Sequence, residues 1–300
     1  MAPEPTWEWP GYTKVIHRSV YSAIDPTNPD NSTAGKVVVV TGGGAGVGAE
    51  IARSFVRSGS KAVVILGRRE SVLSAAKKEL EALGSSKILT YAADVVDEAG
   101  LNKAFTTTEE AVGKVDIVVA CAGFMPEVVP AAIAEIGDWW KAFEVNVRGL
   151  LLTFRAWMPH KSNSTPSFMY VNAAGAHFAP VPGLSGYSPS KIAAASLIGH
   201  LQAENPDLHI TNFHPGILET PVPSMATKSQ FAVTRDDISL PAGFAVWLAS
   251  PAAAWTGGKF LWAHWDVDEL TAMKNEIAQG NELVMTLNGW PKQVDVVVKA

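Results

Sequence analysis

From residue 36 onward the chain alternates short apolar runs with longer amphipathic stretches. The apolar runs are rich in β-branched residues, which is typical of strands buried in a parallel sheet. They span residues 37–42, 62–67, 87–95, 116–123, 167–175 and 209–216. The alanine-rich stretches between them predict helices near residues 49–58, 72–83, 99–112, 139–158 and 189–204. Strands that alternate with helices in this way predict an α/β fold with a doubly wound parallel sheet in a single domain.

The two ends of the chain lack this alternation. Residues 1–34 are rich in proline and polar residues, so they predict an N-terminal arm that is either laid over the domain or disordered. Trp7, Trp9 and Tyr12 favour a packed arm. We place the domain at residues 35–264 and a C-terminal extension packed on it at 265–300. About half of the ten tryptophans follow residue 245; they pack the tail onto the sheet, line an oligomer interface, or wall a substrate pocket.

Composition limits the kinds of partner. The 300 residues are 47% hydrophobic and 18% charged, with a formal net charge of −5, which gives no electrostatic reason to expect nucleic acid or a membrane surface. A small-molecule substrate is expected, and no metal site is predicted. Cys121 is the single cysteine and the first residues lack a secretory signal, so we expect a cytoplasmic protein. The apolar runs are too short to cross a bilayer, which takes about 20 residues.

A glycine-rich turn, TGGGAGVG, lies between the first predicted strand and the first helix, with Gly42, Gly46 and Gly48 as its spaced glycines. Glycine lets the backbone turn sharply and approach a pyrophosphate, whose charge faces the free N–H groups of the helix. A tight turn alone also explains glycines. The position between a strand and a helix favours a dinucleotide site.

Two arginines, Arg68 and Arg69, follow the second predicted strand, where dinucleotide folds contact the adenosine ribose. An acidic residue there suits NAD, whereas arginine accommodates the 2′-phosphate of NADP. The alternative is a solvated pair of charges at the start of a helix. We therefore predict NADP(H) as the cofactor, with Arg68 as the first candidate.

The segment YSPSK places Tyr187 and Lys191 four residues apart, so on a helix they share one face. A nearby ammonium stabilises a phenolate and lowers the pKa of the phenol toward neutrality, which suits it to acid–base catalysis. Taken alone, such a pair also arises by chance.

Together, several segments resemble the classical short-chain dehydrogenases/reductases, which have a Rossmann fold. They are TGGGAGVG, Asp94, the CAG at 121–123, Asn146 within VNVRGLL, YSPSK and PGILET at 215–220. The resemblance covers roughly residues 36–262. The arm and the motif WAHWDVDEL also resemble a fungal branch of this family, many of whose members act in secondary metabolism.

The resemblance implies roles for individual residues. Tyr187 would be the general acid/base, Lys191 would tune it and hold the nicotinamide ribose, and Asn146 would hold a water in a proton relay. The implied cofactor-binding residues are Thr41, Gly42, Gly44, Gly46, Val47, Gly48, Arg68, Arg69, Asp94, Val95, Ala122, Gly123, Tyr187, Lys191, Pro215, Gly216, Ile217 and Thr220. It also implies a homodimer or homotetramer built on the helices at 139–158 and 189–204.

The sequence departs from the family pattern at two places. The family's N-A-G is here Cys121-Ala122-Gly123, and we expect the cysteine to be a small buried residue with an unreactive thiol. The family's catalytic serine stands about thirteen residues before the tyrosine, where this chain has Ala174. Loss of one such hydrogen-bond donor typically costs roughly 10²- to 10³-fold in rate, or about 3 to 4 kcal/mol.

The loss of the serine leaves three outcomes open. Another donor such as His177, Ser185 or a water replaces it, the substrate is activated enough to need none, or hydride transfer has been abandoned. Ala174, His177 and Phe178 are the predicted substrate-side residues, although His177 also fits a purely structural role in a loop. The leading hypothesis is an NADP(H)-dependent oxidoreductase acting on a medium-sized apolar substrate. The alternatives are a non-redox cyclase, isomerase or dehydratase on the same fold, and a sensor or scaffold that binds the cofactor without catalysis.

Overall fold

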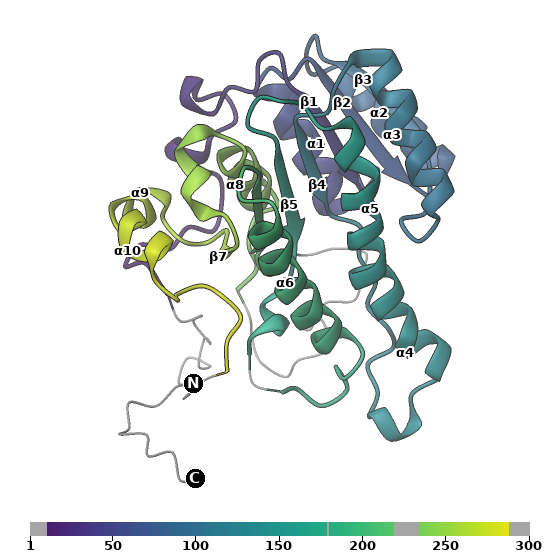
Figure 1. Cartoon of the computed structure of the whole chain (residues 1–300), viewed down its shortest axis with the longest axis vertical. Helices are drawn as coiled ribbons and strands as arrows, with labels where there is room; N and C mark the ends of the chain where they lie inside the picture. The colour runs from purple at the N-terminus through teal and green to yellow at the C-terminus, as the bar shows by residue number, and fades with distance from the viewer. Residues whose placement is uncertain (1–10, 179, 219–233, 288–300) are drawn as a thin grey trace, which may run out of the picture.

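The computed structural model describes residues 11–178, 180–218 and 234–287. Within them lies a parallel sheet of seven strands in the order β3-β2-β1-β4-β5-β6-β7, with helices on both faces (Figure 1). The strands are β1 (Val37–Thr41), β2 (Ala62–Gly67), β3 (Lys87–Ala92), β4 (Ile117–Ala120), β5 (Ser167–Val171), β6 (His209–His214) and β7 (Phe260–Trp262). The predicted doubly wound sheet is confirmed. The strand order reverses between β1 and β4, which is where such folds bind ligands.

The helices pack as two layers. They are α1 (Gly46–Arg57), α2 (Glu70–Glu81), α3 (Glu98–Val112), α4 (Ile136–Phe143), α5 (Gly149–Trp157), α6 (Tyr187–Glu204), α8 (Ser239–Leu248), α9 (Val267–Ala272) and α10 (Lys274–Gln279). Short 3₁₀ turns are η1 (Ser22–Ile24), η2 (Pro29–Asn31), η3 (Ala131–Ile133), η5 (Met158–His160), η6 (Ala174–Ala176) and η7 (Pro251–Thr256). The buried residues of α1, α2 and α8 join one core cluster, and those of α3 and α5 join the other. The buried strands thus have an apolar layer on each face, as their uninterrupted apolar runs require.

Two details differ from the predicted elements. The expected helix at 139–158 is interrupted by a π-helical turn, η4 (Glu144–Arg148), where the Gly149 N–H bonds the Glu144 carbonyl five residues back. Such turns are frequent at functional sites. The sequence also did not predict β7, because a run of three residues, FLW, is too short to stand out. Its three residues are buried and pair in parallel with the end of β6.

The described part of the N-terminal arm is packed rather than disordered. Ile24 is fully buried, and a Cβ atom added at Gly243 of α8 would lie only 2.6 Å from the Ile24 carbonyl oxygen. Ile16 forms an antiparallel bridge with Trp265, which binds the arm to the start of the C-terminal extension. Trp7 and Trp9 lie outside the described residues. Tyr12 donates to Glu282 and lies against Trp265, with ring centroids 5.2 Å apart.

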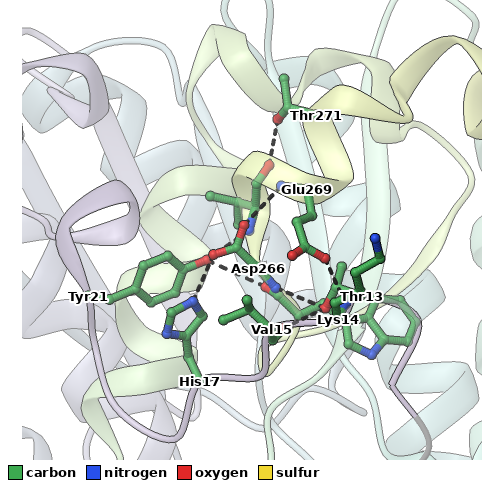
Figure 2. Close-up of polar contacts among 10 residues, drawn as sticks. Thr13, Lys14, Val15, His17, Tyr21, Asp266, Glu269 and Thr271 are labelled. Atoms are coloured by element: carbon green, nitrogen blue, oxygen red, sulfur yellow. Dashed lines mark hydrogen bonds and ion pairs between the residues drawn. The ribbon is translucent and has the colours of Figure 1, made fainter.

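The arm and the extension are joined by a set of polar contacts, which we call the clasp (Figure 2). His17 pairs with Asp266 at 2.8 Å, and the Val267 N–H donates to the Tyr21 hydroxyl at 2.8 Å. The Lys14 N–H donates to Glu269 at 2.6 Å. Trp262 and Trp265 are buried and stacked 5.9 Å apart, so these two aromatics pack the tail onto the sheet. Across the described segments, no helix has the length and apolar character needed to cross a membrane.

Candidate active site

The glycine-rich turn brings β1 and α1 into close contact. Gly42 has φ +70°, and a Cβ atom there would lie 3.1 Å from the Ala122 backbone nitrogen. A Cβ atom at Gly48 would lie 2.4 Å from the Gly42 carbonyl oxygen, which is closer than any side chain allows. Ala45, the residue before α1, provides no side-chain cap, so no side chain of the cap occupies the first N–H groups of the helix. The turn therefore fits a pyrophosphate held by backbone N–H groups.

Other predicted cofactor residues lie around this turn. The Thr41 hydroxyl accepts from the Cys121 and Ala122 N–H groups, at 3.1 Å each, so this side chain fixes the end of β4 beside β1. Gly44 and Val47 remain partly exposed within the turn. A hollow of about 450 Å³ touches Gly44 but runs between α1 and α2, and none of its lining residues belongs to the Tyr187 site.

Arg68 and Arg69 lie where the second strand meets α2, and both are exposed. Asp94 lies beyond β3, where its carboxylate accepts from the Val96 N–H at 3.2 Å. Val95 is buried, and a Cβ atom at Gly149 would lie 2.8 Å from its side chain. The ends of β2 and β3 thus place two exposed guanidinium groups and one carboxylate that is hydrogen-bonded to its own loop at the expected adenosine end of the site.

The structure brings Tyr187 and Lys191 together on the first turns of α6. The Lys191 Nζ atom lies 5.8 Å from the centre of the Tyr187 ring. It also lies 3.8 Å from where a Gly123 Cβ atom would be, an ordinary van der Waals distance, so Gly123 is a direct neighbour of the lysine. The predicted pair and Gly123 therefore share one site at the carboxyl edge of the sheet.

Burial controls the ionisation of this pair. It raises the pKa of Tyr187 to about 12 and lowers the pKa of Lys191 to about 7. The sequence led us to expect the opposite direction for the phenol, with the ammonium lowering its pKa. Desolvation favours the neutral form of each group, and it is the largest cause of both shifts. The phenol is consequently protonated at neutral pH.

Asn146 lies in the π-helical turn and is fully buried. Its Oδ1 accepts from the Phe124 N–H, and its Nδ2 donates to the Phe124 carbonyl and to Ser190 Oγ, at 2.8, 2.8 and 3.0 Å. Ser190 in turn donates to the Tyr187 carbonyl at 2.6 Å. Both amide hydrogens are therefore used to connect the segment after β4 to α6. A relay water would have to bind the main-chain carbonyl or the remaining Oδ1 lone pair.

The segment after β6 contains Pro215, Gly216 and Ile217. Gly216 has φ +104°, and its hypothetical Cβ atom would lie 2.9 Å from the carboxylate of Asp236, a residue for which the sequence gave no signal. Asp236 accepts from the Ile217 N–H at 2.7 Å, and also contacts His264 at 2.7 Å and Arg18 at 3.1 Å. The arm thus helps to hold the segment expected beside the nicotinamide. Thr220 lies outside the described residues.

Ala174 stands where a serine would polarise the substrate. It is buried, and its N–H donates to His214 Nδ1 at 3.1 Å. The predicted alternative donors lie nearby in the chain: Ser185 Oγ accepts from Trp139 Nε1 at 3.1 Å, and His177 Nε2 accepts from Trp262 Nε1 at 2.9 Å. The contact between Ala174 and His214 was not foreseen, although His214 directly precedes the Pro-Gly pair.

His177 is held among aromatic rings, with centroids 5.0 Å from both Phe178 and Phe260 and 5.4 Å from Trp262. Burial of the imidazole lowers the pKa of His177, which keeps it neutral. An indole N–H only donates, so Nε2 must be the acceptor and the hydrogen must reside on Nδ1. His177 can therefore offer one donor of fixed position while the residue keeps an exposed surface.

Cys121 and Tyr170 complete the surroundings of Lys191. Tyr170 is buried, whereas Cys121 keeps intermediate exposure and is less buried than the sequence led us to expect. Burial raises the pKa of the Cys121 thiol to about 12, so the thiol stays protonated, as expected for an unreactive cysteine. The Tyr170 hydroxyl on β5 accepts a hydrogen bond from Lys191. The sequence did not predict this contact. The available signal was a phenol hydroxyl between the apolar residues Met169 and Val171 of a buried strand. Among the described residues, no group of three His, Cys, Asp or Glu side chains is placed to hold a metal ion.

Comparison with known proteins agrees with this arrangement. A family model described as short chain dehydrogenase matches residues 36–230. The short chain dehydrogenase/reductase AacuD of Aspergillus aculeatus is 34% identical over 276 residues, covering 91% of this chain and 94% of AacuD. The short chain dehydrogenase andI of Emericella variicolor is 31% identical over 283 residues, covering 92% of this chain and 96% of andI.

The solved structures give the same result. A dehydrogenase/reductase from Sinorhizobium meliloti superposes with a TM-score of 0.72 and 27% identity, over 78% of this chain and 95% of that one. The fungal relatives confirm the resemblance to a fungal branch. With the parallel sheet, the glycine turn and the Tyr187/Lys191 pair all in place, this chain belongs to the short-chain dehydrogenase/reductase family of oxidoreductases.

Proposed function

We propose that the chain is an NADP(H)-dependent oxidoreductase that reduces a carbonyl or imine, or oxidises an alcohol, in a medium-sized apolar substrate. The substrate would be a biosynthetic intermediate. The observation that carries the proposal is the placement of Tyr187 and Lys191 beside Gly123, at the carboxyl edge where the strand order reverses. When bound, the nicotinamide supplies or accepts the hydride.

The site residues perform the proton chemistry. Because burial keeps Tyr187 protonated, its phenol can donate a proton to an oxygen or nitrogen that gains charge during reduction. Lys191 is buried beside it, and its ammonium would stabilise the phenolate left behind. Asn146 and Ser190 fix the backbone at the start of α6, so the phenol is held by the fold itself.

The preference for NADP(H) rests on Arg68 and Arg69. Both are exposed at the end of β2, where their guanidinium groups are accessible to a 2′-phosphate. A guanidinium binds a phosphate through two parallel hydrogen bonds and an opposite charge. The ribose hydroxyls of NAD(H) are uncharged and gain less from the same arginine.

His177 is the residue we propose to replace the missing serine. Its Nδ1–H is fixed by the bond from Trp262, and it lies three residues from Ala174. Ser185 is the weaker choice because its oxygen already accepts from Trp139. A neutral imidazole donor would restore part of the catalytic rate, which falls roughly 10²- to 10³-fold when the serine is lost.

The test is turnover by the purified full chain with NADPH and a panel of ketones, conjugated enones and cyclic imines. Loss of nicotinamide absorbance should depend on Tyr187, and Tyr187→Phe should lower the rate roughly 10³-fold. Tyr91→Phe, which removes a phenol hydroxyl from β3, is the matched control. A rate unchanged in Tyr187→Phe would remove this tyrosine from the mechanism.

A second candidate function is a non-redox cyclase, isomerase or dehydratase on the same fold, and Ala174 is the observation that favours it. Fold does not determine chemistry, and the absent hydroxyl matters less when no carbonyl needs to be polarised for hydride attack. Formation of a product at the oxidation level of its substrate, without consumption of NADPH, would decide for this candidate.

A homodimer or homotetramer is also part of the proposal. The two helical regions predicted to form the interface carry exposed apolar side chains. These are Trp140, Leu151 and Ile192, exposed by 54, 36 and 41%. Their burial between subunits would remove this apolar surface from water. Size-exclusion chromatography with light scattering tests it, and a monomer at all concentrations would contradict it.

A further inference from the structure

The side-chain nitrogen of Lys191 is held by a second tyrosine, which lies beneath it in the sheet. Lys191 Nζ donates to the Tyr170 hydroxyl at 2.8 Å and to the Val171 carbonyl at 3.1 Å. It also lies 4.5 Å from the centre of the Tyr170 ring. Tyr170 is 1% exposed and belongs to β5, whereas Lys191 belongs to α6.

Few titratable groups face this nitrogen, and each comes from a different element. They are Tyr170 on β5, Tyr187 on α6, Cys121 after β4 and His214 at the end of β6. Burial raises the pKa of both the Tyr170 phenol and the Cys121 thiol, and it lowers the pKa of His214. At neutral pH these neighbours are therefore uncharged. A buried ammonium at Lys191 then depends on neutral acceptors in place of a carboxylate.

We propose that Tyr170 is a positioning residue, whose buried hydroxyl holds Lys191 beside Tyr187 and keeps the lysine charged where water is excluded. The proposal deepens the proposed function, because it assigns to β5 the support of the Tyr187/Lys191 pair. It also fits the altered site, since Ala174 replaces the serine just after β5, and the Tyr170 hydroxyl, four residues earlier on that strand, accepts from the lysine.

The chemistry of the pair explains why a tyrosine suits this position. While Lys191 is charged, it donates to the Tyr170 oxygen, and the ring adds a favourable contact with the cation. When Lys191 loses its proton, its lone pair can accept from the Tyr170 hydroxyl, so the two side chains stay together in both states. A phenylalanine would fill the same space but would offer no acceptor. Tyr170→Phe therefore separates the hydroxyl from the packing.

The experiment follows the ionisation of Lys191 directly, in the full chain and without cofactor. Lysines are labelled with ¹³C at Cε, the signal of residue 191 is assigned by its loss in Lys191→Arg, and its chemical shift is followed against pH. Removal of a hydrogen bond to a charged group should lower the Lys191 midpoint by about one pH unit in Tyr170→Phe, a tenfold weaker proton affinity. Tyr91→Phe is the control and should leave the midpoint unchanged.

NADPH binding provides the second readout, measured by quenching of tryptophan fluorescence against pH. In Tyr170→Phe the pH at which NADPH affinity declines should move with the Lys191 midpoint. An identical Lys191 midpoint in wild type and Tyr170→Phe would overturn the proposal, because a purely packing role would leave the titration unchanged. A shifted midpoint in a protein that does not bind NADPH would support the role of Tyr170 while contradicting the proposed function.

Discussion

The end of β1 and the end of β5 lie on the same edge of one sheet, yet they relate differently to the family pattern. At β1 the glycines agree with the pattern, and contacts of the backbone explain them, as the 2.4 Å approach at Gly48 shows. At β5 the pattern has changed, with Ala174 in place of the serine and Tyr170 beneath the lysine. Steric contacts of the backbone determine the residues of the first region, whereas hydrogen-bonding groups determine those of the second.

This difference indicates which part of the site can vary. Where the backbone approaches as closely as it does at Gly48, a side chain cannot be accommodated, and this constraint does not depend on the substrate. Under the proposed function the segment after β5 would contact the reacting group, and its donors could be exchanged when the substrate changes. We therefore expect substitutions in the first region to abolish cofactor binding and substitutions in the second to alter rate and specificity.

The largest effect should come from Gly48→Ala. Its Cβ atom would lie 2.4 Å from a backbone oxygen, so the turn must shift, at a cost of about 3 kcal/mol, and NADPH affinity should fall at least 100-fold. Gly46→Ala is the control, because Gly46 has φ +55° with nothing near its Cβ position. This substitution should weaken NADPH binding by only about 1 kcal/mol. Isothermal titration with NADPH measures both. Equal losses would show that backbone conformation, and not the close approach, determines the turn.

Ala174→Ser should increase activity, in contrast to the loss expected for Gly48→Ala. If the pocket retains the geometry of a reductase, the added hydroxyl should raise turnover of simple ketones by about 30-fold, or roughly 2 kcal/mol in the transition state. Ala173→Ser adds the same group one residue away and should give no gain. Initial rates of NADPH consumption test the pair. No gain in Ala174→Ser would mean that the end of β5 is specialised for another chemistry.

The sequence predicted the sheet well because the central strands are nearly continuous apolar runs, as the burial of every residue of Val37–Thr41 requires. The more polar β3 and β6 were predicted from their place in the alternation of strands and helices. It missed β7, whose three residues carry too little signal, and the π-helical turn, which has no recognisable composition. Local propensity does not report a hydrogen-bond shift within a helix.

Candidate site residues were predicted where a motif fixes them, as for Tyr187 and Lys191. Residues that act through a distant partner were missed. Asp236 is hydrogen-bonded to Ile217 and Arg18, and Tyr170 is hydrogen-bonded to Lys191. These partners are far apart in the sequence and meet only in the folded chain. The direction of the Tyr187 pKa was also mispredicted, because burial cannot be seen in a spacing of four residues.

Arg68→Ser should weaken the adenosine end of the cofactor site without distorting the glycine turn. Removal of one guanidinium from the 2′-phosphate should weaken NADPH binding about tenfold, or roughly 1.4 kcal/mol, and leave NADH binding unchanged. Arg155→Ser removes the same charge from an exposed position on α5 and should affect neither cofactor. Fluorescence titrations with both cofactors measure the ratio. Equal weakening of NADPH and NADH would assign Arg68 to general stability and refute its contact with the 2′-phosphate.

The smallest effect concerns the clasp, which joins the arm to the C-terminal extension. Next to it in the arm, Arg18 pairs with Asp236, which holds the segment after β6. Asp266 pairs with His17 at 2.8 Å and caps α9 through the Glu269 N–H at 2.9 Å. Although burial alone would raise the pKa of Asp266, these hydrogen bonds hold it below its usual value.

Asp266→Asn keeps the cap but removes the charge, so the free energy of unfolding should fall by about 1 kcal/mol at neutral pH. A lowered carboxyl pKa contributes stability above the unfolded pKa of about 3.9, and this stability is lost as pH falls through the folded pKa. The difference between wild type and variant in urea unfolding should therefore shrink below about pH 4. Asp268→Asn, exposed on the same turn, is the control. A difference that persists unchanged into acid would mean that packing, and not the charged pair, joins the arm to the extension.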